Sequence, residues 1–389
     1  MSRRFSTVFT FRLAAVAQGD ASIQDQTWTN VGPFGGIITA LATHPARRQI
    51  KARLTIVLTI LFASIFTACQ EPKSSSNSSY EWSLLGLEEE SINAIAVDPS
   101  DDRTIYAGST INYDANKFGG LFKSIDGGSS WDTLMSGTII RDIDIHPANP
   151  QIIYVLGGGA LVSKTTDGGR TWVAADSGLV LGLYGVPGIL AIDPLNPETL
   201  YMGSNDFGVA YLYKSSDGGL NWKRIGQSDI VYGGVTALAI DPDNSDILYV
   251  GTEGVGAILK STDGGTSWDR LDFPEVGIVN DLLVHPAHPE IVYAGTWRYG
   301  FYYSTNGGTT WENANTGLPD TVGVRRVQLS DAGIYIAAND MSKGAAYLRS
   351  QDGRWTMVGA QTFVRINTIA VSRRGTVYAG ALGIYVLSD

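Results

Sequence analysis

The sequence offers little sulfur or imidazole chemistry. Among its 389 residues there is one cysteine, Cys69, so an intrachain disulfide is excluded. There are four histidines, and each stands directly before a proline: His44, His146, His285 and His288. Structural zinc sites need clustered Cys and His ligands, and a Ser-His-Asp triad needs a histidine held between its partners. We therefore expect no metal, no cofactor and no such triad.

Positive charge is also scarce. The chain has 28 Lys and Arg against 38 Asp and Glu, a net charge of −10. Nucleic-acid binding depends on neutralising phosphates with basic side chains. No glycine-rich loop with the pattern of a phosphate site follows a strand and opens a helix. We therefore expect no nucleic-acid partner, and the acidic balance suits a soluble protein of the cell envelope.

One short motif recurs six times with a period of about 45 residues, which is typical of repeat architectures. A Ser or Thr is followed by Asp-Gly-Gly and then by a Trp, as in Ser261-Thr-Asp263-Gly-Gly-Thr-Ser-Trp268. The fifth copy has Asn in place of Asp, and the sixth is shortened to Asp352-Gly353-Arg354-Trp355. The acidic or amide positions of the six copies are Asp126, Asp167, Asp217, Asp263, Asn306 and Asp352. Glycine accepts positive φ, and the Asp side chain can accept hydrogen bonds from the backbone of its own turn. We interpret these residues as structural turn residues, because no catalyst needs its carboxylate six times.

This pattern resembles the Asp-box (BNR) repeat of sialidases, xyloglucanases, sortilin-type receptors and photosystem II assembly-factor propellers. The resemblance covers roughly residues 80 to 389 and implies a β-propeller whose boxes lie away from the ligand face. A single ring is most similar to the photosystem II assembly-factor propellers, which implies a scaffold or assembly role.

The repeat count predicts an all-β, seven-bladed β-propeller over residues 80–389. Seven buried strands, from Ile92–Val97 to Arg365–Val371, are each followed by a Tyr-rich strand. The last repeat lacks its outer strand, and the segment around Trp82 resembles one. Pairing of that segment with the C-terminal strand would close the ring and remove an exposed sheet edge. His146 and His285 replace the Asp that other repeats carry, so we interpret them as turn residues.

Upstream of the repeats, residues 51–69 are typical of a lipoprotein signal peptide. A basic stretch precedes an apolar run at 54–66 that is short for a membrane span, and Thr67-Ala68-Cys69 follows. This predicts a lipidated Cys69 and a Ser-rich tether at 70–79. Residues 1–50 form an anomalous extension containing a propeller-like segment at Trp28. We interpret it as a wrongly chosen start or a fused propeller fragment.

Strand direction reverses at every turn, so the loops between blades and those between second and third strands share the face opposite the boxes. We expect this face to bind the ligand or partner. The predicted ligand- or partner-binding residues are Trp297, Arg298, Tyr299, Arg141, Arg325, Arg365 and Tyr113. Aromatic side chains and arginines are frequent anchors of interfaces, and Trp297-Arg298-Tyr299 is the best single candidate. The alternative is that these loops are simply polar and that the Trp covers its own blade.

Two functions remain open. The preferred hypothesis is a non-enzymatic, monomeric, lipid-anchored scaffold or assembly factor of the bacterial cell envelope that binds a protein or glycan. The alternative is a glycoside hydrolase, xyloglucanase-like or sialidase-like, which would need two carboxylates flanking a sugar. Asp206 and Glu253 are its speculative catalytic pair. Arg141, Arg325 and Arg365 could form the arginine triad that the resemblance to sialidases implies, but the Arg-Ile-Pro start of those enzymes is absent.

Overall fold

The computed structural model describes residues 8–9, 28–29, 80–181, 185–206, 209–226, 233–253, 258–274, 277–359 and 363–388. The chain divides into two compact units, Met1–Ser74 and Ser75–Asp389. In the first unit, β1 (Val8–Phe9) pairs antiparallel with β2 (Trp28–Thr29). The predicted signal segment, Cys69 and the predicted tether at 70–79 lie outside the described residues.

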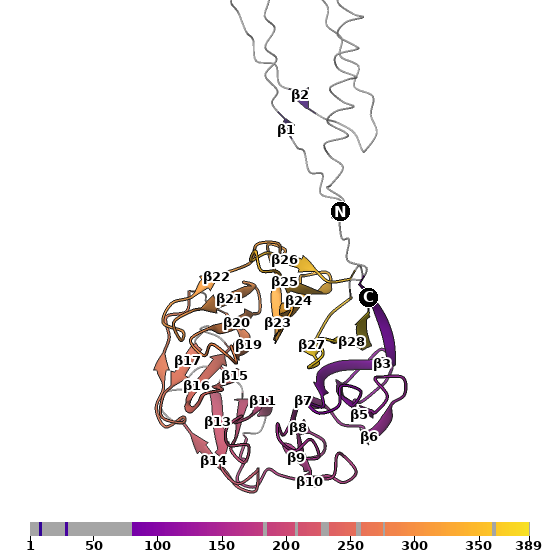
Figure 1. The fold of residues 1–389 in the computed structure, drawn as a ribbon, viewed down its shortest axis with the longest axis vertical. Coiled ribbons are helices and arrows are strands. Elements are labelled where there is room, and N and C mark those ends of the chain that lie inside the picture. The colour runs from indigo at the N-terminus through magenta and orange to yellow at the C-terminus, as the bar shows by residue number, and fades with distance from the viewer. Residues whose placement is uncertain are drawn as a thin grey trace, which may run out of the picture. The chain divides into compact units, whose positions relative to one another are not determined.

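Five four-stranded antiparallel sheets follow one another along the second unit. Their strands, in chain order, are β7 (Ile140–Ile145), β8 (Ile153–Gly157), β9 (Val162–Thr165) and β10 (Val173–Ala174); β11 (Val186–Ile192), β12 (Leu200–Asp206), β13 (Val209–Ser215) and β14 (Trp222–Ile225); β15 (Val235–Asp241), β16 (Asn244–Thr252), β17 (Ile258–Ser261) and β18 (Asp269–Arg270); β19 (Val279–Val284), β20 (Val292–Thr296), β21 (Phe301–Ser304) and β22 (Glu312–Asn313); and β23 (Gly323–Ser330), β24 (Gly333–Asn339), β25 (Gly344–Arg349) and β26 (Trp355–Met357). Each sheet is one blade, and its first strand lies nearest the central axis (Figure 1).

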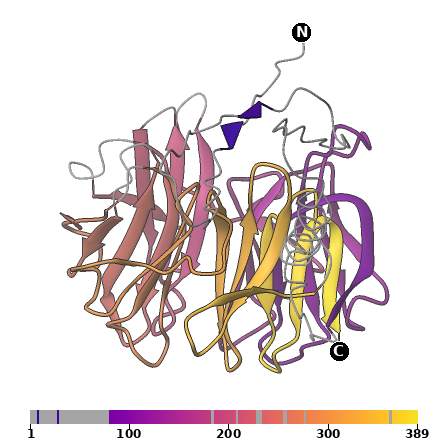
Figure 2. The ribbon, with the colours of Figure 1, turned by 90° about the horizontal axis from the view of Figure 1, so that it is seen from above.

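The remaining strands form one six-stranded sheet. Its order is β27 (Thr368–Val371), β28 (Val377–Ser388), β3 (Glu81–Val97), β4 (Ile105–Thr110), β5 (Gly120–Ser124) and β6 (Asp132–Ser136). The two ends of the propeller therefore meet inside a single sheet. Figure 2 shows the strands of the ring running between its two faces.

The prediction of seven blades is wrong. The described residues contain five four-stranded blades and the six-stranded sheet, because β3 runs unbroken for 17 residues. Its first half pairs with β28 and its second half pairs with β4. The sequence count assumed a loop between these halves, where the structure has only an irregular ladder with positive φ at Gly86 and Leu87. The expected pairing of the segment around Trp82 is present, since Trp82 lies opposite Leu387.

The all-β class is confirmed, and the described residues include no helix. The hydrophobic core lies between neighbouring sheets. Tyr201 and Leu212 of one blade pack with Val235 and Leu248 of the next, and all four are almost fully buried. The inner strands place apolar residues on both faces, because each face contacts a neighbouring sheet, and they also carry the charged residues that line the channel.

Candidate functional site

The Asp boxes occupy one end of the blades and are closed turns. In the box at Asp263, Ser261 Oγ donates a hydrogen bond to Asp263 Oδ1 at 2.8 Å, and the Gly265 N–H donates to Ser261 Oγ at 2.9 Å. The N–H and hydroxyl of Ser267 donate to the two carboxylate oxygens of Asp263 at 2.9 and 2.6 Å. Gly264 and Gly265 have φ of +69° and +89°, values that favour glycine. These bonds, the Ser267 hydroxyl first, lower the pKa of Asp263 to about 2.

Four of the six boxes also accept hydrogen bonds from the preceding sheet. The Gly307 carbonyl accepts hydrogen bonds from Lys260 Nζ at 2.9 Å and from the Tyr249 hydroxyl at 3.2 Å. Lys123, Lys164 and Lys214 make the same contact with the boxes that follow them. The polar groups of the boxes are therefore used in turn closure and in contacts between blades.

Two of the histidines close turns at the same end. The Nδ1 atom of His146 accepts the backbone N–H groups of Ala148 and Asn149 at 3.2 and 3.1 Å. The Oδ1 atom of Asp241 accepts the N–H groups of Asp243 and Asn244 in the equivalent turn. His and Asp therefore serve the same role as acceptors in these turns, as the sequence predicts.

At the opposite end, a β-bulge recurs in the innermost strands. The residue in the bulge often bonds to the next blade, as when Asn280 Nδ2 donates to the Val324 carbonyl at 2.8 Å. Asn93 and Thr236 likewise donate to a carbonyl of the sheet that follows their own. Arg141 and Arg325 occupy the same bulge position on β7 and β23. These two arginines depart from the repeat, and this departure is the sequence signal that marks them.

A basic aromatic patch, defined by Trp297, Arg298, Tyr299 and Arg325, lies at this end. The guanidinium of Arg325 stacks over the Trp297 ring, with its Cζ 4.4 Å from the ring centroid. Trp297 and Tyr299 are 39% and 42% exposed, and Arg298 is exposed. The four residues are therefore held together and remain accessible.

The backbone around the patch is firmly fixed. The Thr296 hydroxyl accepts the Tyr299 N–H at 3.1 Å and donates to the Gly300 carbonyl at 2.9 Å. Asn315 Nδ2 donates to the Tyr299 carbonyl at 2.8 Å. A Cβ at Gly323 would lie 2.1 Å from the Trp297 carbonyl oxygen, so this close approach of two backbones requires glycine. The loop that carries Trp297 is therefore preorganised.

The other predicted binding residues have different surroundings. Arg141 is half-buried, and burial lowers the pKa of its guanidinium. Arg365 is exposed, and Tyr113 is 84% exposed in the loop between β4 and β5. No hydrogen bond, ion pair or ring contact joins Arg141, Arg325 and Arg365 within the part of the chain that the structure describes.

The speculative catalytic carboxylates are only partly described. Glu253 is half-buried, and its Oε2 accepts a hydrogen bond from Asn205 Nδ2 at 2.6 Å. The backbone of Asp206 pairs with Val209, but its side chain lies outside the described part of the structure. The separation of this carboxylate pair stays untested, and so does its role.

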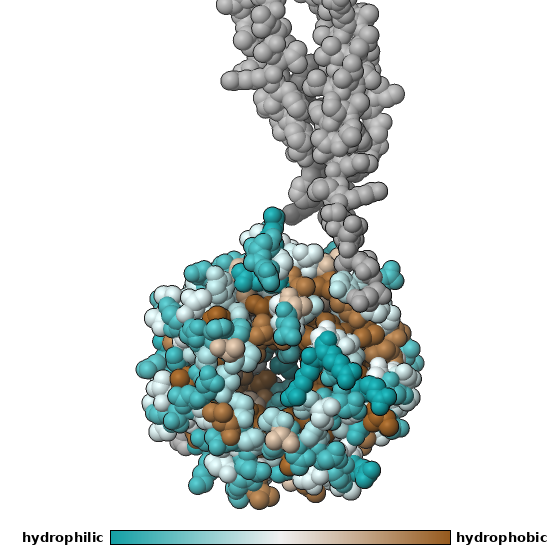
Figure 3. All heavy atoms as spheres, in the orientation of Figure 1, coloured by the Kyte–Doolittle hydropathy of each residue, from teal (hydrophilic) through white to brown (hydrophobic). Residues whose placement is uncertain are grey.

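The central channel contains a charged cluster that sequence reasoning did not assign to a site: Asp142, Asp144, Asp281 and Arg326. The channel encloses about 520 Å³, and hydrophilic residues lie at its mouth on one face (Figure 3). Arg326 Nη2 lies 3.2 Å from Asp142 Oδ1, and Arg326 Nη1 lies 3.5 Å from Asp281 Oδ1. Asp142 lies on β7, which packs against β3 and β11, and Arg326 lies on β23, which packs against β19 and β27. The contact of Arg326 with Asp142 therefore spans the channel.

The cluster is largely buried, and its charged groups shift one another's pKa values. Burial lowers the pKa of the Arg326 guanidinium, but the neighbouring carboxylates raise it by more. Burial raises the pKa of Asp281. Burial and then the charge of Asp142 raise the pKa of Asp144, whose Oδ2 is buried with no hydrogen-bond partner among the described residues. The signal in the sequence was the charge on inner strands, as in Ile140-Arg-Asp142-Ile-Asp144.

Two further features are absent from the described residues. No cluster of three or more His, Cys, Asp or Glu in that part of the chain could hold a metal ion. Nor does it contain a helix long and apolar enough to span a membrane.

Comparison with known proteins places these features among Asp-box propellers. Residues 202–387 match the family model described as photosynthesis system II assembly factor YCF48. The oligoxyloglucan-reducing end-specific xyloglucanase of Emericella nidulans is 26% identical over 258 residues, covering 60% of this chain and 30% of the enzyme. The photosystem II assembly lipoprotein Ycf48 of Synechococcus sp. is 26% identical over 189 residues, covering 47% of this chain and 52% of the lipoprotein.

Solved structures agree on the fold. The structure titled "YCF48 bound to D1 peptide" superposes with a TM-score of 0.58 at 18% identity, covering 80% of this chain and 96% of that one. The chain spans about half the length of the lipoprotein relative and less than a third of the xyloglucanase. The part of the chain that the structure describes from residue 80 onward is an Asp-box β-propeller, similar to both the photosystem II assembly factors and the xyloglucanases.

Proposed function

We propose that this protein is a non-enzymatic scaffold that binds a protein partner through the basic aromatic patch. The observation that carries this proposal is the stacked Arg325–Trp297 pair beside exposed Arg298 and Tyr299. Trp, Tyr and Arg are the residue types most enriched at the energetic centres of protein interfaces. A rigid loop also loses little entropy on binding.

Charge favours an acidic partner segment. The chain carries a net charge of −10, yet the patch has two arginines and no carboxylate. Complementary charge raises the association rate and selects the partner. The homologous structure that holds a peptide supports a protein rather than a glycan as the partner.

Anchoring to the membrane of the cell envelope is part of the same proposal. It rests on the basic stretch, the apolar run at 54–66 and Cys69 that follows it. One relative is itself named a lipoprotein. Partition of the full chain, but not of its Cys69→Ser variant, into a detergent phase would support lipid attachment, and equal partition would contradict it.

Site-specific cross-linking tests which end of the propeller meets the partner. A photoreactive residue replaces Arg298 in one sample and Arg170 in another; both arginines are exposed, but Arg170 lies in an Asp box. In envelope preparations of the source cells, we expect a defined partner to be captured from position 298 and not from position 170. Capture of the same partner from position 170 alone would contradict the proposal.

The similarity to a xyloglucanase keeps a glycoside hydrolase as the second candidate. It would need two carboxylates placed about one glycosidic bond, for which Asp206 and Glu253 are the candidates. Release of oligosaccharides from xyloglucan by the purified chain, lost in both Asp206→Asn and Glu253→Gln, would overturn the scaffold proposal.

A further inference from the structure

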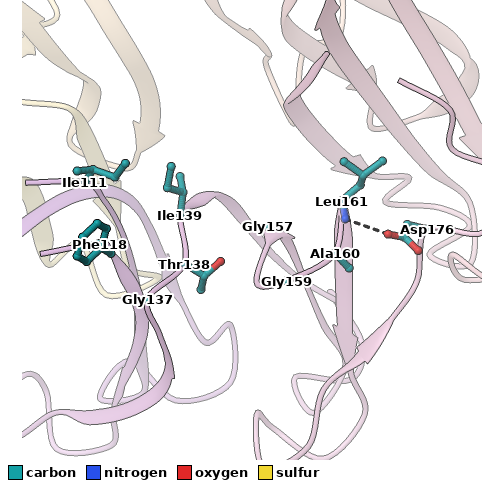
Figure 4. Close-up of a pocket in the computed structure, with 10 residues that line it drawn as sticks. All are labelled: Ile111, Phe118, Gly137, Thr138, Ile139, Gly157, Gly159, Ala160, Leu161 and Asp176. Carbon is teal, nitrogen blue, oxygen red and sulfur yellow. Dashed lines mark hydrogen bonds between the residues drawn. The ribbon is translucent and has the colours of Figure 1, made fainter. Parts of the chain in front are cut away.

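A second surface at the end opposite the boxes is apolar rather than basic. A cleft of about 610 Å³ lies between the loops that follow β4, β6, β8 and β10 (Figure 4). We call it the apolar cleft. Its hydrophobic walls come from Ile111, Phe118, Ile139, Ala160 and Leu161.

The cleft leaves apolar surface in contact with water. Ile111 and Phe118 lie together on one wall, and Leu161 lies across the gap on the other (Figure 4). Phe118 is 62% exposed, and Tyr113 of the same loop is 84% exposed. Covering such surface contributes about 25 cal/mol per Å², and contiguous exposed apolar patches commonly mark interaction sites.

Two glycines line part of the cleft without a side chain of their own. Gly137 and Gly159 line it, and a Cβ at either position would meet no atom within 4 Å. The space above these backbones is therefore unfilled by the chain's own side chains.

One charged residue, Asp176, lines the cleft. Its Oδ2 accepts the Leu161 N–H at 2.9 Å, and its Oδ1 has no hydrogen-bond partner in the described residues. Lys117, the basic residue of the loop after β4, is already paired with Glu89 at 3.1 Å. The cleft is thus apolar with an acidic edge.

The geometry points to a docking site for an aromatic or aliphatic side chain of a partner protein whose neighbouring residue is Lys or Arg. The apolar side chain enters between Phe118 and Leu161, and the basic neighbour pairs with Asp176. This site is distinct in position and charge from the basic aromatic patch, and it does not require that patch to bind anything.

Short peptides test the site on the full chain. The probe is a fluorescent, end-blocked peptide Gly-Ser-Phe-Lys-Ser-Gly, compared with versions in which Phe becomes Ala or Lys becomes Glu. We expect the parent peptide to bind, and either replacement to weaken binding about tenfold, as measured by fluorescence polarisation. Equal binding of the Lys and Glu peptides, or no binding of the parent, would overturn the inference.

Variants locate the binding. Ala160→Phe fills the cleft and should abolish binding, whereas Asp176→Asn keeps an oxygen for the Leu161 N–H and should remove only the preference for Lys over Glu. Met341→Ser removes an apolar side chain that is 92% exposed elsewhere and should change nothing. Trp297→Ala should also leave peptide binding intact, which separates this site from the proposed function. Dimers of the wild-type chain that dissociate in Phe118→Ser would instead assign the cleft to a second copy.

Discussion

At the scale of a single residue, Arg326 is the cation of the charged cluster in the channel. Its guanidinium is the cation that contacts both Asp142 and Asp281, whose side chains are only 6% and 9% exposed. The carboxylates also accept backbone N–H groups from the following blades, Leu190 and Val327. Removal of the cation would leave two buried carboxylates facing each other across the channel.

Replacement of Arg326 therefore has a large expected cost. Arg326→Gln should lower the free energy of unfolding by about 3 kcal/mol, the lower end of the range for breaking a buried ion pair, since the arginine is partly exposed. Urea unfolding measures this. The neighbouring Arg325 stacks on Trp297 at the surface. Arg325→Gln removes the same charge, and it should lower the free energy of unfolding by less than about 1 kcal/mol. Equal losses of stability in the two variants would contradict a stabilising contact of Arg326 with Asp142 and Asp281 across the channel.

At the scale of an element, the Asp boxes link stability to pH. Hydrogen bonds lower the pKa of the box carboxylates, to about 2 at both Asp126 and Asp263. A group with a lowered folded pKa stabilises the fold above its unfolded pKa, which is about 4 for Asp. That stabilisation is lost as the pH falls through the folded pKa, so acid unfolding should begin between about pH 4 and pH 2.

The chain contains a natural control for this prediction. The box at Asn306 keeps the same turn with an amide, since Asn306 Oδ1 accepts the Thr310 N–H and Nδ2 donates to the Thr310 hydroxyl. We expect Asp263→Asn to fold normally at neutral pH and to lose stability less steeply than wild type below about pH 4. Circular dichroism during acid titration measures the slope, and an unchanged slope would contradict the assignment.

The sequence predicts local features better than those that join distant segments. The pairing at Trp82 joins distant segments, yet it was predictable because the last repeat lacks an outer strand. The box turns and the His and Asp turn residues follow from motifs within one repeat. The continuity of β3 does not, because Gly86 and Leu87 suit a loop as well as an irregular ladder. The contact of Arg326 with Asp142 joins residues 184 positions apart and depends on how many sheets close the ring.

At the scale of the whole molecule, the pairing of β3 with β28 closes the propeller. Trp82 is 7% exposed, its Nε1 donates to the Val358 carbonyl at 2.8 Å, and its ring meets Phe363 edge-on at 5.8 Å. One side chain thus ties the first strand of the ring to the last blades.

Loss of this side chain should loosen the closure. Trp82→Ala should lower the free energy of unfolding by about 3–5 kcal/mol, because it removes a buried aromatic and leaves a cavity. The nearby Tyr80→Ala is a suitable control, since Tyr80 is 43% exposed, and it should change stability by at most about 0.5 kcal/mol. Thermal unfolding of both variants tests the closure, and a negligible effect at Trp82 would contradict it.

At this scale, the ring carries the boxes at one end and exposed arginines and aromatic residues at the other. The affinity of the cross-linked partner for wild type, Arg298→Ala and Arg170→Ala tests the central proposal most directly. We predict a loss of about 30-fold for Arg298→Ala, which corresponds to about 2 kcal/mol, and no change for Arg170→Ala. A loss with Arg170→Ala and none with Arg298→Ala would contradict binding through the basic aromatic patch.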